Sequence, residues 1–295
     1  MLLVTGASGL NGHAVVRRLS AQRVPVRALV RSLNPARTAD LATLAGVEIV
    51  EGDMARPETL VAALRGVERA FLTSSSDSAM LEVQSSFIDA ARSAGVRHVV
   101  KLSGIMPELD SAFRFARMHA QIEQKLEASG MAFTHLRAGE FMHAYFRQVP
   151  SIVSQSTIRW PMEDACIASV DVADIADVAV AVLTGAGHEG QIYPLTGPAA
   201  LTMAEVAEHI SAAIGRTVRY IHVSPQDYLT ANLAAGMPAF TAEAPVELYA
   251  ERRAGKEAHV SPLIEKLLGR PPHSFQDFAT RHAAVFRGEH PPPRA

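Results

Sequence analysis

The chain has 295 residues, of which 48% are apolar and 20% are charged, so it can bury a large core in one large domain or two smaller ones. A formal net charge of -2 offers no basic surface for nucleic acid, and the single cysteine, Cys166, excludes a disulfide framework or a thiolate metal cluster. Nothing at the start resembles a signal peptide and no apolar run is long enough to cross a bilayer, so we expect a cytoplasmic protein without a metal site.

The first twelve residues predict a phosphate-binding turn. A short apolar strand at residues 2–4 is followed by three glycines spaced three apart. We expect Gly6 to permit a tight turn, Gly9 to let a pyrophosphate approach bare amides, and Gly12 to allow close contact between helix and strand. The helix that follows would direct its positive dipole end at the anion. A strand-turn-helix corner without a ligand is the alternative. The candidate contacts in this turn are Gly6, Ser8, Gly9, Leu10, Asn11 and Gly12.

A second strand at residues 25–30 leads to Arg31, the place where a dinucleotide fold reads the adenosine ribose. No acidic residue stands there to accept from a free 2′-hydroxyl. A guanidinium can hold a 2′-phosphate in two parallel charge-assisted hydrogen bonds, so we expect NADP(H) to be preferred over NAD(H). Arg37 could share this role, and a solvated arginine at a strand end is the alternative.

Strands and helices continue to alternate. The expected strands cover residues 47–50, 70–73 and 96–104, and the expected helices cover residues 37–44, 57–64 and 79–94. This alternation predicts an α/β fold with a doubly wound parallel sheet, whose ligands lie beyond the carboxyl ends of the strands. Asp53 could accept from an adenine amino group or could be a turn residue. The candidates at these strand ends are Asp53, Met54, Ser74, Ser75, Ser103 and Gly104.

A helix at residues 113–130 and a sixth strand at residues 131–137 precede a segment that we expect to be irregular, residues 143–168. Its apolar and aromatic side chains could form the wall of a pocket for a flat substrate, or could be ordinary core beneath a loop. The candidate wall residues are Met142, Tyr145, Phe146 and Trp160.

The remainder is predicted to be largely helical. We expect helices at residues 171–185, from Thr202 onward, and at 247–257, 261–268 and 274–286, with strands at 191–197 and 216–223. Residues 288–295 contain three consecutive prolines and are expected to be a mobile tail.

Several motifs occur together in this chain. They are Gly6-Ala-Ser-Gly-Leu-Asn-Gly12, Val30-Arg31, Glu51-Gly52-Asp53, His119-x-x-x-Glu123-x-x-Leu126-x-x-Ser129-Gly130, Leu136-Arg137, Asp171-Val-Ala-Asp-Ile-Ala176 and Tyr193-x-Leu-Thr-Gly-Pro198. As a set they resemble the NmrA-like branch of the atypical short-chain dehydrogenase/reductase superfamily. Proteins similar to this chain include NADPH-dependent quinone reductases, triphenylmethane-dye reductases and NmrA-like azoreductases, and also nucleotide-sensing regulators without turnover.

The resemblance implies a Rossmann-type domain that binds NADP(H), formed by residues 1–140 and 169–198. It also implies a smaller, mainly helical C-terminal substrate domain that covers the nicotinamide, formed by residues 141–168 and 199–295. The residues that would border the nicotinamide are Gly139, Glu140 and Phe141.

The chain departs from the superfamily at the proton-transfer pair. Ordinary members use Tyr-x-x-x-Lys, whereas alignment on the Glu123 motif places Phe115 and His119 at these positions. Phenylalanine cannot transfer a proton, so carbonyl–alcohol interconversion by the usual mechanism is not expected. Hydride transfer to a stacked quinone, azo bond or cationic dye needs only orientation, with protons supplied later by water. His119 would contact the nicotinamide or shuttle a proton near neutral pH, or it is a structural histidine.

We therefore expect an NADPH-dependent reductase of small aromatic acceptors that needs neither flavin nor metal, acting as a monomer or homodimer. The alternative is a redox sensor that binds NADP(H) and signals to a regulatory protein partner. Lys101, two residues before Ser103, is interpreted as structural or exposed.

Overall fold

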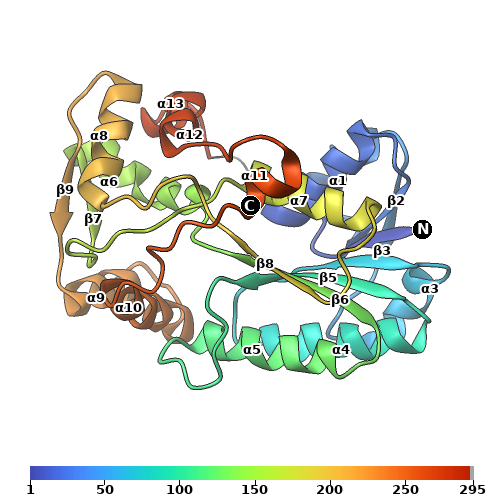
Figure 1. Ribbon diagram of the computed structural model, residues 1–295. Coiled ribbons are helices and arrows are strands. Elements are labelled where there is room, and N and C mark those ends of the chain that lie inside the picture. Colours follow the sequence, from blue (N-terminus) through green and yellow to red (C-terminus); the bar gives the residue numbers. More distant parts are fainter. Residues whose placement is uncertain (293–295) are drawn as a thin grey trace.

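The computed structural model describes residues 1–292, so residues 293–295 of the expected tail lie outside the described residues. A parallel sheet of seven strands forms the centre, in the order β3-β2-β1-β4-β5-β6-β8 (Figure 1). The strands are β1 (Leu2–Val4), β2 (Val26–Val30), β3 (Val47–Glu51), β4 (Arg69–Leu72), β5 (His98–Gly104), β6 (Ala132–Ala138) and β8 (Gln191–Leu195). The strand order reverses between β1 and β4, which is the switch point of a doubly wound sheet. The predicted fold class is confirmed.

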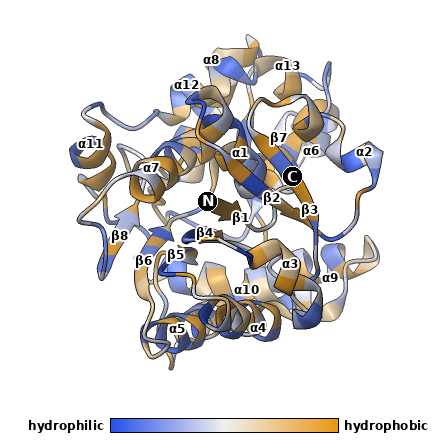
Figure 2. Cartoon of the chain, turned by 90° about the vertical axis from the view of Figure 1, so that its right-hand side faces the viewer, coloured by the Kyte–Doolittle hydropathy of each residue, from blue (hydrophilic) through white to orange (hydrophobic). Residues whose placement is uncertain are grey.

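Helices cover both faces of this sheet (Figure 1). On one face lie α1 (Leu10–Ala21), α7 (Val172–Thr184) and α11 (Leu263–Leu268), and on the other lie α3 (Leu60–Leu64), α4 (Met80–Ser93) and α5 (Arg114–Glu127). Because successive side chains of a strand point to opposite faces, Leu3 joins the core under α3, α4 and α5 while Val4 joins the core under α1 and α7. Both residues are fully buried, as a strand covered on both faces requires. Figure 2 shows the apolar strands β1 and β2 between helices that carry both hydrophobic and hydrophilic residues.

A second lobe, at the left of Figure 1, has its own hydrophobic core. Its elements are η3 (Met142–Gln148), α6 (Val149–Gln155), β7 (Thr157–Trp160), α8 (Met203–Ile214), β9 (Arg219–His222), α9 (Pro225–Ala234), α10 (Ala239–Arg253), α12 (Phe275–Arg281) and α13 (Ala283–Phe286). Strands β7 and β9 pair in parallel although about sixty residues separate them. The division into two domains stays a prediction, and α11, which we assigned to the second domain, packs on the sheet through Ile264.

Several sequence-based expectations were wrong at the level of elements. Residues 143–168 are not irregular, because they contain η3, α6 and β7. Helix α9 was missed, and α10 begins at Ala239 rather than near 247. The helix expected at 37–44 is instead α2 (Pro35–Thr38) followed by η1 (Leu41–Thr43), and a short turn, η2 (Pro57–Thr59), precedes α3. Within residues 1–292, no helix combines the length and apolar character that crossing a membrane requires.

Candidate functional site

The glycine turn joins β1 to α1 as expected. Gly6 has φ +58°, a left-handed conformation that glycine adopts without strain. A Cβ on Gly12 would lie 2.3 Å from the Gly6 carbonyl oxygen, so no larger residue fits where the helix passes over the strand. Gly9 caps α1 and no side chain accepts from the first-turn amides, which leaves them for an anion.

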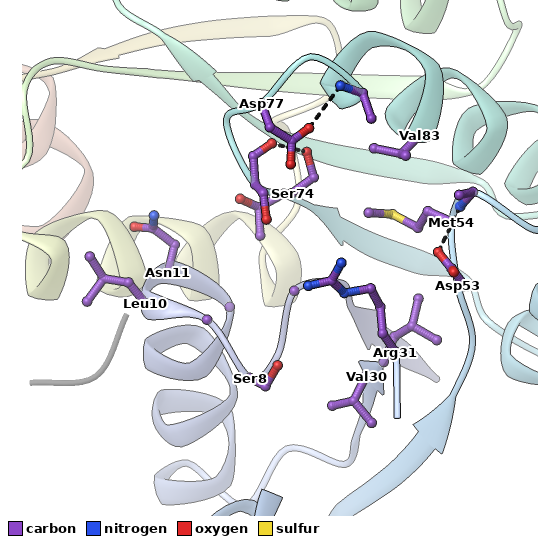
Figure 3. A pocket seen from close by; sticks show the side chains of 18 of the residues that line it. Ser8, Leu10, Asn11, Val30, Arg31, Asp53, Met54, Ser74, Asp77 and Val83 are labelled. Carbon is purple, nitrogen blue, oxygen red and sulfur yellow. Dashed lines mark hydrogen bonds between the residues drawn. The ribbon is translucent and has the colours of Figure 1, made fainter. Parts of the chain in front are cut away.

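This turn forms one wall of a cleft of about 580 Å³ at the carboxyl ends of β1, β2, β3 and β4 (Figure 3). The cleft brings together most of the predicted cofactor contacts: Gly6, Ser8, Gly9, Leu10, Asn11, Gly12, Arg31, Asp53, Met54, Ser74, Ser75 and Phe141. The predicted contacts outside its lining are Ser103, Gly104, His119, Gly139 and Glu140. Four strand ends therefore contribute to one cavity, as the alternation of strands and helices predicted.

Two arginines of the cleft are exposed, and Arg31 extends its side chain into it (Figure 3). Within the described part of the chain Arg31 has no ion pair, so its guanidinium is free to bind a phosphate. Arg37 lines the same cleft. Asp53 accepts from the Ala55 amide at 3.0 Å and lies 3.4 Å from Arg56, which gives it a turn role at the edge of the cavity.

One polar atom beside the glycine turn lacks a partner. The Oδ1 atom of Asn11 is buried and has no hydrogen bond among residues 1–292. Buried polar atoms are normally satisfied, so an unsatisfied one in a cleft indicates that a ligand completes it. The residues of the cleft therefore fit a dinucleotide.

A buried polar cluster lies at the end of β5, next to β4. Lys101 is fully buried, and its Nζ lies 2.9 Å from Nδ1 of His119 and 3.0 Å from Oγ of Ser103. A Cβ on Gly104 would lie 3.1 Å from Cδ2 of His119, so the absence of a side chain there lets the histidine ring lie against the strand. The alternative that Lys101 is exposed was wrong. The position of Lys101 inside an apolar strand could have indicated this polar cluster, because a buried lysine needs hydrogen-bond partners.

Burial shifts the pKa values of the groups in this cluster. Burial lowers the pKa of Lys101 to about 7, although the nearby Glu123 carboxylate opposes the shift. Burial and the charge of Lys101 hold the pKa of His119 well below its usual range. His119 is therefore neutral near pH 7, and this opposes the expectation that it shuttles a proton as an imidazolium.

The side chains of Phe115 and Glu140 both contact other residues of the protein. Phe115 is 9% exposed and packs edge-on against Phe113 and Phe240, with ring centroids 5.7 and 5.8 Å apart. Glu140 is paired with the buried Arg252, which ties the loop after β6 to α10. Arg252 also donates to Glu257 at 2.9 Å.

The expected pocket wall is mostly core. Tyr145, Phe146 and Trp160 are buried in the second lobe, and the hydroxyl of Tyr145 lies 3.0 Å from Oγ of Ser169. Met142 belongs to the same core and also lines a separate cavity of about 220 Å³ between α8 and α12. The structure places the other three in the packing that supports this lobe.

The fold and the cleft define a Rossmann-type dinucleotide-binding protein. Residues 1–269 match the model of the NmrA-like family. The chain belongs to the NmrA-like family, which confirms the resemblance drawn from its motifs.

Relatives cover nearly the whole chain. The chain is 38% identical over 286 residues to the NAD(P)H azoreductase of Xenophilus azovorans, covering 97% of this chain and 99% of that protein. It is also 38% identical over 290 residues to a (4-alkanoyl-5-oxo-2,5-dihydrofuran-3-yl)methyl phosphate reductase of Streptomyces griseus subsp. griseus, covering 98% and 100%. Among solved structures, NADPH-dependent quinone oxidoreductase QOR2 of Escherichia coli in complex with NADPH superposes with a TM-score of 0.86 at 29% identity, covering 95% and 99%.

Proposed function

We propose that the protein is an NADPH-dependent reductase that passes a hydride to a quinone-like, azo or dye-like aromatic acceptor. The observation that carries the proposal is the cleft at the switch point of the sheet, where three glycines and a helix without a side-chain cap meet an arginine that has no ion pair among residues 1–292. Relatives at 38% identity over nearly the full length are named as reductases. The chain is an NAD(P)H-dependent oxidoreductase, and the preference for NADPH and the class of acceptor are the proposed parts.

Each part of the cofactor has candidate residues. The amides at the start of α1 would bind the pyrophosphate, and Arg31, assisted by Arg37, would bind the 2′-phosphate. Phe141 and the polar cluster around Ser103 would border the nicotinamide. When bound, the cofactor supplies the hydride, and the chain supplies orientation and a site from which water is excluded.

The nature of the acceptor follows from Phe115. A phenyl ring packed between two other phenylalanines cannot donate a proton to a carbonyl oxygen. We therefore propose acceptors that take a hydride directly into a conjugated system and obtain protons from water, with no need for flavin or metal. The Streptomyces relative is named for a conjugated lactone, so unsaturated lactones belong in the same test.

The test is oxidation of NADPH by the purified chain. We expect NADPH absorbance to fall when a quinone, azo dye, triarylmethane or unsaturated lactone is added, and NADH to be a poorer donor. A Gly12→Val variant should lose turnover together with cofactor binding, whereas Arg17→Ala, an exposed change on α1 outside the cleft, should not. The absence of turnover across the whole panel would contradict the proposal.

A second candidate function is a redox sensor that binds NADP(H) and signals to a protein partner. The buried phenyl ring of Phe115, which the motif alignment predicts to stand at the place of the proton donor, favours it. A sensor should distinguish NADP⁺ from NADPH in calorimetry and bind a specific partner, with no acceptor reduced. For either function we propose a monomer or homodimer in the cytoplasm, which gel filtration and cell fractionation would test.

A further inference from the structure

Lys101 is a buried cation without a carboxylate at bonding distance. It lies in β5, with β4 on one side and β6 on the other, and its side chain is fully buried. Among residues 1–292 it makes no ion pair, because the nearby Glu123 carboxylate is taken by Arg137 at 2.6 Å. A lysine kept in such a place costs stability, since its ammonium loses hydration without a counter-ion in return.

The surroundings of Nζ match an ammonium group in number and in kind. Its three neighbours are the Leu102 carbonyl oxygen at 3.3 Å, Oγ of Ser103 at 3.0 Å and Nδ1 of His119 at 2.9 Å. The carbonyl can only accept, and an ammonium has three hydrogens and no lone pair. A charged Lys101 therefore donates to all three neighbours at once.

The hydrogen bonds of Lys101 also decide which hydrogens His119 and Ser103 can donate to a ligand. If Nδ1 of His119 accepts, the hydrogen of the neutral ring is on Nε2. If Oγ of Ser103 accepts from Lys101, its own hydrogen can be donated elsewhere. Ser103 and His119 would then both present donors at the end of β5, beside the strand end that supplies Ser74 to the cleft.

We propose that Lys101 is a positioning residue, which holds His119 as the neutral Nε2–H tautomer and makes Ser103 and His119 a pair of hydrogen-bond donors toward the reacting end of the cofactor cleft. This proposal rests on the proposed function. Two donors backed by a buried cation suit an acceptor oxygen or nitrogen that gains negative charge when a hydride adds to it.

The electrostatics of the cluster are consistent with this arrangement. The charged groups that act on it are Glu123 from α5 and Arg137 from β6, and His135 of β6 is a titratable neighbour whose pKa burial lowers. Burial lowers the pKa of Lys101 to about 7, so the lysine is charged below that pH and neutral above it. A neutral amine has a lone pair and can accept from Nδ1–H, so the tautomer of His119 is held firmly only while Lys101 carries its proton.

The first experiment uses the ligand-free protein and does not depend on turnover. In protein labelled with ¹⁵N-histidine, a His119→Gln spectrum assigns the ring signals of His119. We expect the Nε2–H tautomer at about pH 6, no protonation of the ring in the range where a free imidazole titrates, and a shift toward mixed tautomers as pH rises past the pKa of Lys101. An Nδ1–H tautomer at pH 6, or a ring that titrates near its usual pKa, would overturn the proposal.

The second experiment removes the lysine. Lys101→Met keeps the length of the side chain without a charge to desolvate, so it should be at least as stable in thermal unfolding, whereas a purely structural lysine would lower the melting temperature on removal. His119 should then show mixed tautomers at every pH. Lys101→Gln keeps a donor and should retain the Nε2–H form without the change above pH 7. Lys125→Met, which removes an exposed lysine of α5 paired with Asp89, is the matched control and should change none of these signals.

Turnover gives the last measurement. Once a quinone, azo or lactone acceptor that the protein reduces has been found, Lys101→Met should lower kcat for that acceptor about 10²-fold, the loss typical of one oxyanion donor, while the Kd for NADPH stays unchanged. An unchanged kcat would refute the donor role. If no acceptor is reduced, the proposed function fails by itself, and the tautomer of His119 still decides whether Lys101 fixes it.

Discussion

Replacing Arg31 with alanine should separate the two nicotinamide cofactors. The guanidinium of Arg31 lines the cleft at the end of β2 and has no ion pair within the described chain, so its removal leaves no unpaired carboxylate behind. The loss therefore reports on the ligand alone. Two charge-assisted hydrogen bonds to a phosphate, weakened by the exposure of this side chain, amount to about 1.5–3 kcal/mol. This corresponds to a Kd for NADPH that is about 10-fold to 150-fold higher.

Calorimetric titration of both cofactors into both proteins is the assay. NADH lacks the 2′-phosphate, so its affinity should change little, and the NADPH effect should shrink as salt is raised because exposed charges are screened. Arg37 lines the same cleft and can retain part of the affinity, so the double variant should lose more than Arg31→Ala alone. Arg17→Ala carries the same change of charge on α1 and should bind both cofactors normally. An equal loss for NADPH and NADH in Arg31→Ala would refute the assignment.

Three further changes test the fold around the site. Gly12→Ala forces a Cβ to 2.3 Å from the Gly6 oxygen, so α1 must shift, and thermal protection by NADPH should disappear. Arg252→Met leaves the buried Glu257 and the partly buried Glu140 without their cation and should lower the free energy of unfolding in urea by about 3–5 kcal/mol. Burial would raise the pKa of Asp171, but the hydrogen bonds that its carboxylate accepts outweigh burial and lower the pKa. The carboxylate therefore stabilises the fold at pH values above its unfolded pKa, and this stabilisation is lost as the pH falls through its folded pKa. Asp171→Asn, which keeps the cap of α7 but loses the pair with Arg281, should therefore be less stable at pH 7 by about 1–2 kcal/mol, a gap that closes in acid.

The cleft could be predicted from the sequence because its lining residues are set by local patterns. Each contact follows a strand within a few residues, and parallel strands bring their carboxyl ends to one edge whatever the rest of the chain does. Gly6, Arg31 and Ser74 thus meet in one cleft although none of them is near another along the chain. Glycine spacing and strand alternation were sufficient for this part.

The second lobe could not be predicted in the same way. Trp160 stands in β7, which exists only because β9 pairs with it from about sixty residues away, and no local pattern encodes that pairing. The aromatic residues around it were equally consistent with a pocket wall or a core. Whether they form a wall or a core depends on α12 and α13 covering them, and no local sequence pattern reveals that contact.

Lys101 lies between these two cases. The lysine in the run Val99-Val-Lys-Leu-Ser103 conflicts with the burial expected of this strand, since a strand covered on both faces has no water for an ammonium group. Such a cation is retained against its cost only where something needs its hydrogens or its charge. Its partner is His119, and if His119 occupies the place of the lysine of the ordinary Tyr-x-x-x-Lys pair, as the motif alignment predicts, the cation of that pair comes here from the strand beneath the helix. On that prediction a positive charge would lie behind the proposed reacting end of the cleft without a phenol beside it, an arrangement that suits a hydride acceptor needing charge stabilisation rather than a proton from the protein.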